Sequence, residues 1–180
     1  MVTPAPSTTP RPPAIDIMDA TRRVPTETIP WLREHAARAM DALGITGDVR
    51  VRIVDDAEMS QTHEEFLGVS GTTDVITFDM RDPEELPAPP RREPAEIPIR
   101  KDYGSFSFGI DTDIVVCFDE AGRQSASVGY PVAWELLLYV VHGILHCLGE
   151  DDHDEAGSAR MHALEDAVLA AVGVGPVKAR

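Results

Sequence analysis

The sequence predicts an α+β fold, in which a mixed, roughly four-stranded sheet is packed with helices around one central helix. Short apolar segments that alternate or are rich in β-branched residues are separated by segments with apolar residues at helical spacing. The run 131–148 is apolar on nearly every side, as in a helix buried at the centre of a domain. The strands and helices do not form a regular βαβ series, which favours a mixed sheet.

The chain begins with a segment that cannot form a core. Residues 1–13 hold five prolines and almost no large apolar side chain, so we expect a disordered tail. The remainder, 14–180, has the length of one domain. A short strand is predicted over Ala14–Met18, and a helix over Thr28–Leu43 that ends at Gly44.

Two further strands flank a second helix. The alternating run 49–53 (VRVRI) predicts a strand with one exposed face. Asp55 or Asp56 then caps a helix that runs to about Leu67. The β-branched segment Thr73–Phe78 predicts the next strand.

Residues 81–108 are rich in proline and charge and have no sustained period, which predicts a long loop inserted in the domain. The densest basic cluster of the chain falls in this loop, at Arg91, Arg92, Arg100 and Lys101. Two interpretations stay open: a solvated loop, or a loop that contacts a polyanion.

The second half of the chain holds one clear strand and three helices. The apolar segment Asp113–Phe118 predicts a central or well-covered strand. A short helix is expected over Asp119–Ser127, followed by the central helix Pro131–Leu148, which ends at Gly149. Asp154 can cap a terminal helix with one apolar face.

Composition places the chain among globular proteins and restricts its partners. Of 180 residues, 43% are hydrophobic and 26% charged. The two cysteines, Cys117 and Cys147, are expected to be small buried apolar residues of a reducing compartment. No uninterrupted membrane span and no secretion signal stand out, so a cytoplasmic protein without a membrane partner is expected. The net charge of -15 argues against general binding of nucleic acid, and no DNA partner is expected.

Three of the six histidines lie close together, at His142, His146 and His153. Four helical residues turn the chain by about 400°, so His142 and His146 leave the same face of the central helix one turn apart. Beyond Gly149 the chain can turn back and bring His153 towards them. Three nitrogen ligands with one open position are typical of a catalytic zinc site, so one Zn²⁺ ion is the predicted cofactor.

The alternatives to this site are histidines satisfied within the core and a zinc peptidase. A pair of histidines four residues apart also arises by chance, and the third histidine is what favours the metal site. In peptidases with the H-E-x-x-H motif, the residue after the first histidine is the glutamate base. Here that residue is Gly143, which argues against peptide hydrolysis.

The segment VHGILHCLGEDDH resembles the signature H-G-x-L-H-L-x-G-Y-D-H of the YbeY family of metal-dependent endoribonucleases. TTDVITF, DIVVCFDEA and VRIVDD resemble further family segments, and the resemblance covers roughly Val49 to Val172. It implies a mixed sheet with a central ligand helix and zinc bound by His142, His146 and His153. It also implies a role in 3′ end maturation of small-subunit (16S) ribosomal RNA and in ribosome quality control.

Two positions depart from the family pattern. The third family histidine stands ten residues after the first, where this chain has Asp152, followed by His153. One extra residue in a turn is easily absorbed and imidazole matches the other ligands, so His153 is the predicted ligand and Asp152 a candidate catalytic base. Asp152 as the ligand stays the alternative, since zinc also accepts carboxylate oxygen. The family also carries an arginine where alignment places Leu67, and Arg50, Arg52 or a loop arginine are the candidates to replace it.

The favoured hypothesis is zinc-dependent cleavage of single-stranded RNA, with ribosomal RNA and the small ribosomal subunit as partners. A second hypothesis is a non-catalytic ribosome-associated assembly factor with a zinc site. A third is another metal-dependent hydrolase, for which the sequence names no substrate.

Overall fold

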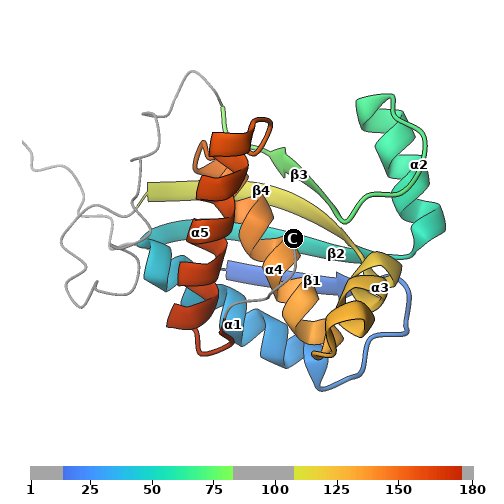
Figure 1. The fold of residues 1–180 in the computed structure, drawn as a ribbon, viewed down its shortest axis with the longest axis horizontal. Coiled ribbons are helices and arrows are strands. Elements are labelled where there is room, and N and C mark those ends of the chain that lie inside the picture. The colour runs from blue at the N-terminus through green and yellow to red at the C-terminus, as the bar shows by residue number, and fades with distance from the viewer. Residues whose placement is uncertain (1–13, 83–107, 176–180) are drawn as a thin grey trace, which may run out of the picture.

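A four-stranded mixed sheet forms the frame of the protein (Figure 1). The computed structural model describes residues 14–82 and 108–175. The strands lie in the order β1-β2-β4-β3, with β1, β2 and β4 parallel and β3 antiparallel to β4. Their bounds are Ala14–Asp19 for β1, Ile45–Val54 for β2, Val75–Asp79 for β3 and Phe108–Cys117 for β4. The predicted α+β class, the mixed sheet and the internal position of β4 are confirmed.

Strand β4 begins at Phe108, earlier than the predicted start at Asp113. Gly109 and Asp111 interrupt the apolar pattern there, so the side chains alone do not indicate a strand. The backbone nevertheless pairs in register with the first half of β2, from Ile45 opposite Phe108 onwards. The predicted tail 1–13 and most of the predicted loop, including its four basic residues, lie outside the described residues.

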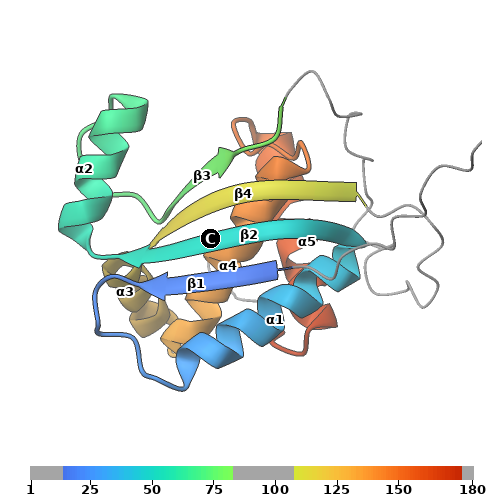
Figure 2. The ribbon, with the colours of Figure 1, turned by 180° about the vertical axis from the view of Figure 1, so that it is seen from behind.

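The helices within residues 14–82 and 108–175 cover one face of this sheet. Their bounds are Thr28–Leu43 for α1, Asp56–Leu67 for α2, Phe118–Val128 for α3, Val132–Cys147 for α4 and Glu155–Ala171 for α5. Helices α1 and α4 pack on one face of the sheet, α5 packs on these two helices on the same side, and Figure 2 shows that these helices leave the other face of the sheet uncovered. α2 stands to one side, beyond the end of β2 (Figure 2).

Helix α4 is the central helix that the sequence predicts. Every residue from Glu135 to Leu145 is buried. At Gly143 the helix approaches the sheet so closely that a Cβ atom would lie 2.6 Å from Thr77 Oγ1 and 3.0 Å from Ile114 Cδ1. The missing side chain at Gly143 therefore sets the distance between the helix that carries the histidines and strands β3 and β4.

Aspartate caps fix where two helices begin. The Asp55 carboxylate accepts a hydrogen bond from the Glu58 amide at 2.9 Å, so Asp55 rather than Asp56 is the cap of α2. The Asp154 carboxylate accepts from the Gly157 amide at 2.7 Å, as predicted for α5.

Both cysteines are free and buried, as predicted. Among the described helices, none is by itself long and apolar enough to cross a membrane. Within the same part of the chain, only α3 and α4 taken together have such a length and composition, and they are bent by 119° at the break between them.

Candidate metal centre

Two histidine side chains from the last turns of α4 converge on one point. His142 and His146 stand one helical turn apart, and their Nε2 atoms lie 2.9 Å from each other. The two rings are nearly perpendicular, at 86°, in a T-shaped arrangement. The predicted pairing of these two residues on one helix face is confirmed.

The other ring nitrogen of each histidine has a partner that sets the tautomer. His146 Nδ1 donates to the backbone carbonyl of Glu150 at 3.0 Å, and a carbonyl oxygen can only accept. His142 Nδ1 donates to the carboxylate of Glu165, a buried residue of α5, at 2.6 Å. With both protons on Nδ1, the two Nε2 atoms present lone pairs to each other. A shared cation at this separation, either a proton or a metal ion, satisfies both nitrogens.

Burial, together with the neighbouring His142 ring, lowers the pKa of His146. The ring is therefore neutral at neutral pH, which is the form that binds a metal ion.

Asp152 supplies a third donor at this point. Its two carboxylate oxygens lie 3.8 Å from His142 Nε2 and 3.8 Å from His146 Nε2. Ligand atoms of these three residues all lie within 4.8 Å of one another. Two imidazoles and one carboxylate form a donor set that divalent transition metals accept.

His153 lines the same pocket but does not belong to the group formed by His142, His146 and Asp152. Its side chain is 87% exposed, and its Nδ1 lies 3.4 Å from Asp151 and 4.0 Å from Asp152. The structure thus brings His142, His146 and Asp152 together, and it leaves His153 outside this group.

The turn that carries these residues is held from both sides. Gly149 adopts a φ of 81°, which ends α4 and reverses the chain. The Glu150 carboxylate then receives two hydrogen bonds from Arg160 of α5, at 2.7 and 2.9 Å, with both side chains largely buried. This ion pair fixes the Glu150 backbone, and with it the carbonyl that orients His146.

A pocket of about 570 Å³ opens above the histidines, between α4 and the edge strand β3. It is lined by Leu67, Thr73, Asp74, Val75, Ile76, Thr77, Asp79, His142, His146, Cys147, Asp152 and His153. Thr77 Oγ1 is buried on this wall without a hydrogen-bond partner among the described residues. A group entering the pocket could supply that partner. The convergent nitrogens and this hydroxyl both fit a metal ion with bound water.

The pocket contains no lysine or arginine among its described lining residues. Leu67, which the sequence resemblance aligns with the family arginine, lines it with 58% of its surface exposed. Arg81 lies nearby and donates to the Cys147 carbonyl at 2.5 Å. It also lowers the pKa of Asp79, which keeps that pocket carboxylate ionised.

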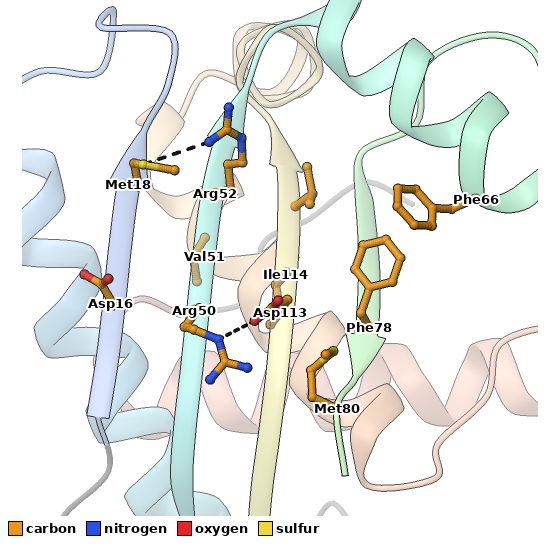
Figure 3. A pocket seen from close by; sticks show the side chains of 11 residues that line it. Asp16, Met18, Arg50, Val51, Arg52, Phe66, Phe78, Met80, Asp113 and Ile114 are labelled. Atoms are coloured by element: carbon orange, nitrogen blue, oxygen red, sulfur yellow. Dashed lines mark hydrogen bonds and ion pairs between the residues drawn. The ribbon is translucent and has the colours of Figure 1, made fainter. Parts of the chain in front are cut away.

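Arg50 and Arg52 do not replace the family arginine. Figure 3 shows both on the uncovered face of the sheet, where they line a separate pocket of about 550 Å³. Arg50 is paired with Asp111 and Asp113, and Arg52 with Glu58. They alternate along β2 with the valines that face the helices, so they point away from the histidines.

Cys147 lines the pocket, and its thiol is hydrogen-bonded to Thr112 of β4. Burial raises the pKa of its thiol, and the Sγ atom donates to Thr112 Oγ1 at 3.3 Å. The protonated thiol agrees with the predicted role of a small buried residue.

Sequence reasoning missed Glu165, Arg160 and Thr77. Glu165 is an acidic residue on the buried stripe of α5, beside Leu164 and Val168, and this position was the available signal. A carboxylate on an apolar stripe needs a buried partner, which here is His142.

The fold and the site together define a class: an α+β protein in which a central helix presents a two-histidine, one-carboxylate group, able to hold a divalent metal ion, to an open pocket. A sequence profile of the family described as Endoribonuclease YbeY matches residues 15–173. The chain belongs to the YbeY endoribonuclease family, and the match extends further towards the N-terminus than the predicted 49–172.

Relatives named Endoribonuclease YbeY support this assignment. The protein of Moorella thermoacetica is 32% identical over 78% of this chain and 82% of its own length. That of Halorhodospira halophila is 37% identical over 74% of this chain and 76% of its own length. The solution structure of TM1509 from Thermotoga maritima has a TM-score of 0.50 at 22% identity, covering 87% of this chain and 89% of that one. This similarity shows a common fold.

Proposed function

We propose that this protein is a zinc-dependent endoribonuclease that cleaves single-stranded RNA. Its role would be 3′ end maturation of 16S ribosomal RNA and ribosome quality control, in the cytoplasm and on the small ribosomal subunit. The observation that carries the proposal is the pair of Nε2 atoms, 2.9 Å apart, on the wall of an open pocket in a chain of this family.

The residues of the pocket divide the work between binding and proton transfer. His142 and His146 would hold the ion, with a third ligand from the turn 151–153. When bound there, zinc supplies Lewis acidity for a phosphoryl oxygen and lowers the pKa of coordinated water. One candidate to move the proton is Asp79, which is ionised beside Arg81. The other candidate is the residue of the pair Asp152 and His153 that does not bind the ion.

Electrostatics explains why a ribosomal partner belongs to the proposal. The chain carries a net charge of -15, and the described lining of the pocket offers no lysine or arginine to the RNA backbone. Phosphate neutralisation supplies much of the affinity of most nucleic-acid complexes. Here the small subunit would have to present the RNA end and supply that neutralisation.

Cleavage of a labelled single-stranded RNA that ends in precursor 16S sequence tests the proposal. The assay would be run with and without purified small subunits. We expect zinc-loaded wild type to cleave the RNA, and His146→Ala prepared in the same way not to cleave it. The variant controls for contaminating ribonuclease. Equal cleavage by the variant would refute the proposed site, and no cleavage in either form, with or without subunits, would refute the activity.

The non-catalytic assembly factor remains a second candidate because of one observation. The exposed apolar side chain of Leu67 stands at the position where the family has an arginine to meet phosphate. This candidate predicts that the protein co-sediments with ribosomal particles but gives no turnover. A hydrolase of peptides is not supported, because Gly143 packs against the sheet and no glutamate follows His142.

A further inference from the structure

We propose that Asp152, and not His153, is the third protein ligand of the metal, which makes the centre a two-histidine, one-carboxylate site. This inference rests on the metal site of the proposed function, but not on RNA cleavage. It differs from the three-histidine set that the resemblance implies.

The first argument is the direction of the side chains. The Asp152 carboxylate lies 3.8 Å from each of the two Nε2 atoms, with one oxygen towards each ring. The lone pairs of those nitrogens are directed to the same point by Glu165 and by the Glu150 carbonyl. An ion between the nitrogens therefore meets the carboxylate without any change of the backbone.

The second argument is that the turn has little freedom to exchange the two residues. The first turn of α5 packs directly on the Asp151 carbonyl, since a Cβ atom on Gly157 would lie 2.3 Å from that oxygen. The His153 amide donates to the Asp151 carboxylate at 3.1 Å. A shift that carried His153 to the metal would break this bond and push the Asp151 peptide against α5. The turn therefore cannot rearrange to absorb the extra residue, contrary to the expectation from the sequence.

The third argument is solvent exposure. The His153 side chain is 87% exposed, against 36% for Asp152 and 31% for His146. A ligand that completes a site at the wall of a pocket is expected to be partly withdrawn from solvent, as Asp152 is. His153 stays at the mouth of the pocket, where it could contact substrate.

A carboxylate ligand changes the chemistry of the centre. Two neutral imidazoles and one carboxylate leave a divalent ion with a net charge of about +1, instead of +2 with three imidazoles. Carboxylate oxygen is a harder donor than imidazole nitrogen. A site with one carboxylate should therefore bind Mn²⁺ more tightly, relative to Zn²⁺, than a site with three imidazoles does. We expect Asp152→His to lower the ratio of Mn²⁺ to Zn²⁺ affinity.

Metal binding by matched variants tests the inference without any RNA. Zinc affinity would be measured by chelator competition, and zinc content by elemental analysis, for wild type, Asp152→Ala and His153→Ala. Replacing a residue that only orients a ligand lowers metal affinity about 10- to 100-fold. Replacing a direct ligand should cost more, so we expect Asp152→Ala to bind zinc about 100-fold or more weakly than wild type. His153→Ala should stay within about twofold. Circular dichroism and the melting temperature of the metal-free proteins show whether each variant folds.

The outcomes separate this inference from the proposed function. A larger loss in His153→Ala than in Asp152→Ala overturns the inference and leaves the nuclease proposal standing. Loss confined to Asp152→Ala supports it, whether or not the protein cleaves RNA. Wild type that binds no zinc at all overturns both. Where Asp152→Ala fails to fold, Asp152→Asn decides, with a loss of affinity expected because an amide is a poorer ligand than a carboxylate.

Discussion

At the scale of single residues, the centre depends on groups that touch no metal. The Glu165 carboxylate is 4% exposed and holds the His142 ring by a bond of 2.6 Å to Nδ1. An imidazole with a carboxylate on its far nitrogen is held in one orientation. The Arg160 and Glu150 pair does the same for His146 through the backbone.

Replacing Glu165 should separate metal affinity from fold stability. Glu165→Ala leaves the buried His142 N–H unsatisfied, which costs about 1–3 kcal/mol of unfolding free energy. Glu165→Gln retains an acceptor oxygen, so we expect it to recover most of that stability and yet bind zinc about 10- to 100-fold more weakly. Urea unfolding and chelator competition measure the two effects, with the exposed Glu155→Gln on the same helix as control. Unchanged zinc affinity in Glu165→Gln would contradict the orienting role.

At the scale of elements, sequence and structure agree best where a pattern is local. The helices, the caps Asp55 and Asp154 and the internal position of β4 all follow from periods and capping residues within a few positions. The start of β4 could not be predicted, because its pairing with β2 depends on backbone partners more than 60 residues away. The contact between His142 and Glu165 could not be predicted either, because it joins residues 23 positions apart through the packing of α5 on α4.

Gly143 gives the contact between α4 and the sheet a direct test. In an exposed helix interior, Gly→Ala stabilises by about 1 kcal/mol, and a Cβ atom on Gly122 of α3 would meet nothing within 4 Å. At Gly143 the same change meets Thr77 and Ile114, so we expect Gly143→Ala to destabilise by about 1–3 kcal/mol and to lower zinc affinity. Gly122→Ala should stabilise. Equal effects of the two substitutions on chemical denaturation would show that the close approach is unimportant.

The junction of α2 and α3 should show a defined pH dependence. Hydrogen bonds from Arg123 lower the pKa of Asp56 from 3.8 to about 2. Because the folded pKa is the lower one, the ionised carboxylate stabilises the fold above pH 3.8, and this contribution is lost as the pH falls towards 2. Both side chains are partly exposed, so Asp56→Asn should cost less than about 1 kcal/mol at pH 7. The difference between wild type and variant in urea unfolding should shrink below pH 4; a constant difference would rule out this ion pair as its cause.

At the scale of the whole molecule, the sheet separates two surfaces of different character. The helix side carries the candidate metal centre beside the edge strand β3, and the other side carries a pocket lined by Phe66, Phe78 and paired arginines (Figure 3). The net charge of -15 of the whole chain differs from the basic field of a protein that binds RNA unaided. The family and the histidine pair could be predicted from sequence, whereas the absence of a cation from the described pocket lining required the structure.

The most direct test of metal-dependent cleavage is to follow RNA cleavage as a function of zinc occupancy in a single preparation. Zinc would be removed by a chelator, restored in steps and quantified at each step, with small ribosomal subunits present throughout. We expect the cleavage rate to rise in proportion to occupancy, up to one ion per chain, and to fall to background in the chelated sample. A rate that does not change with occupancy, while His146→Ala also cleaves, would contradict a metallonuclease built on His142 and His146.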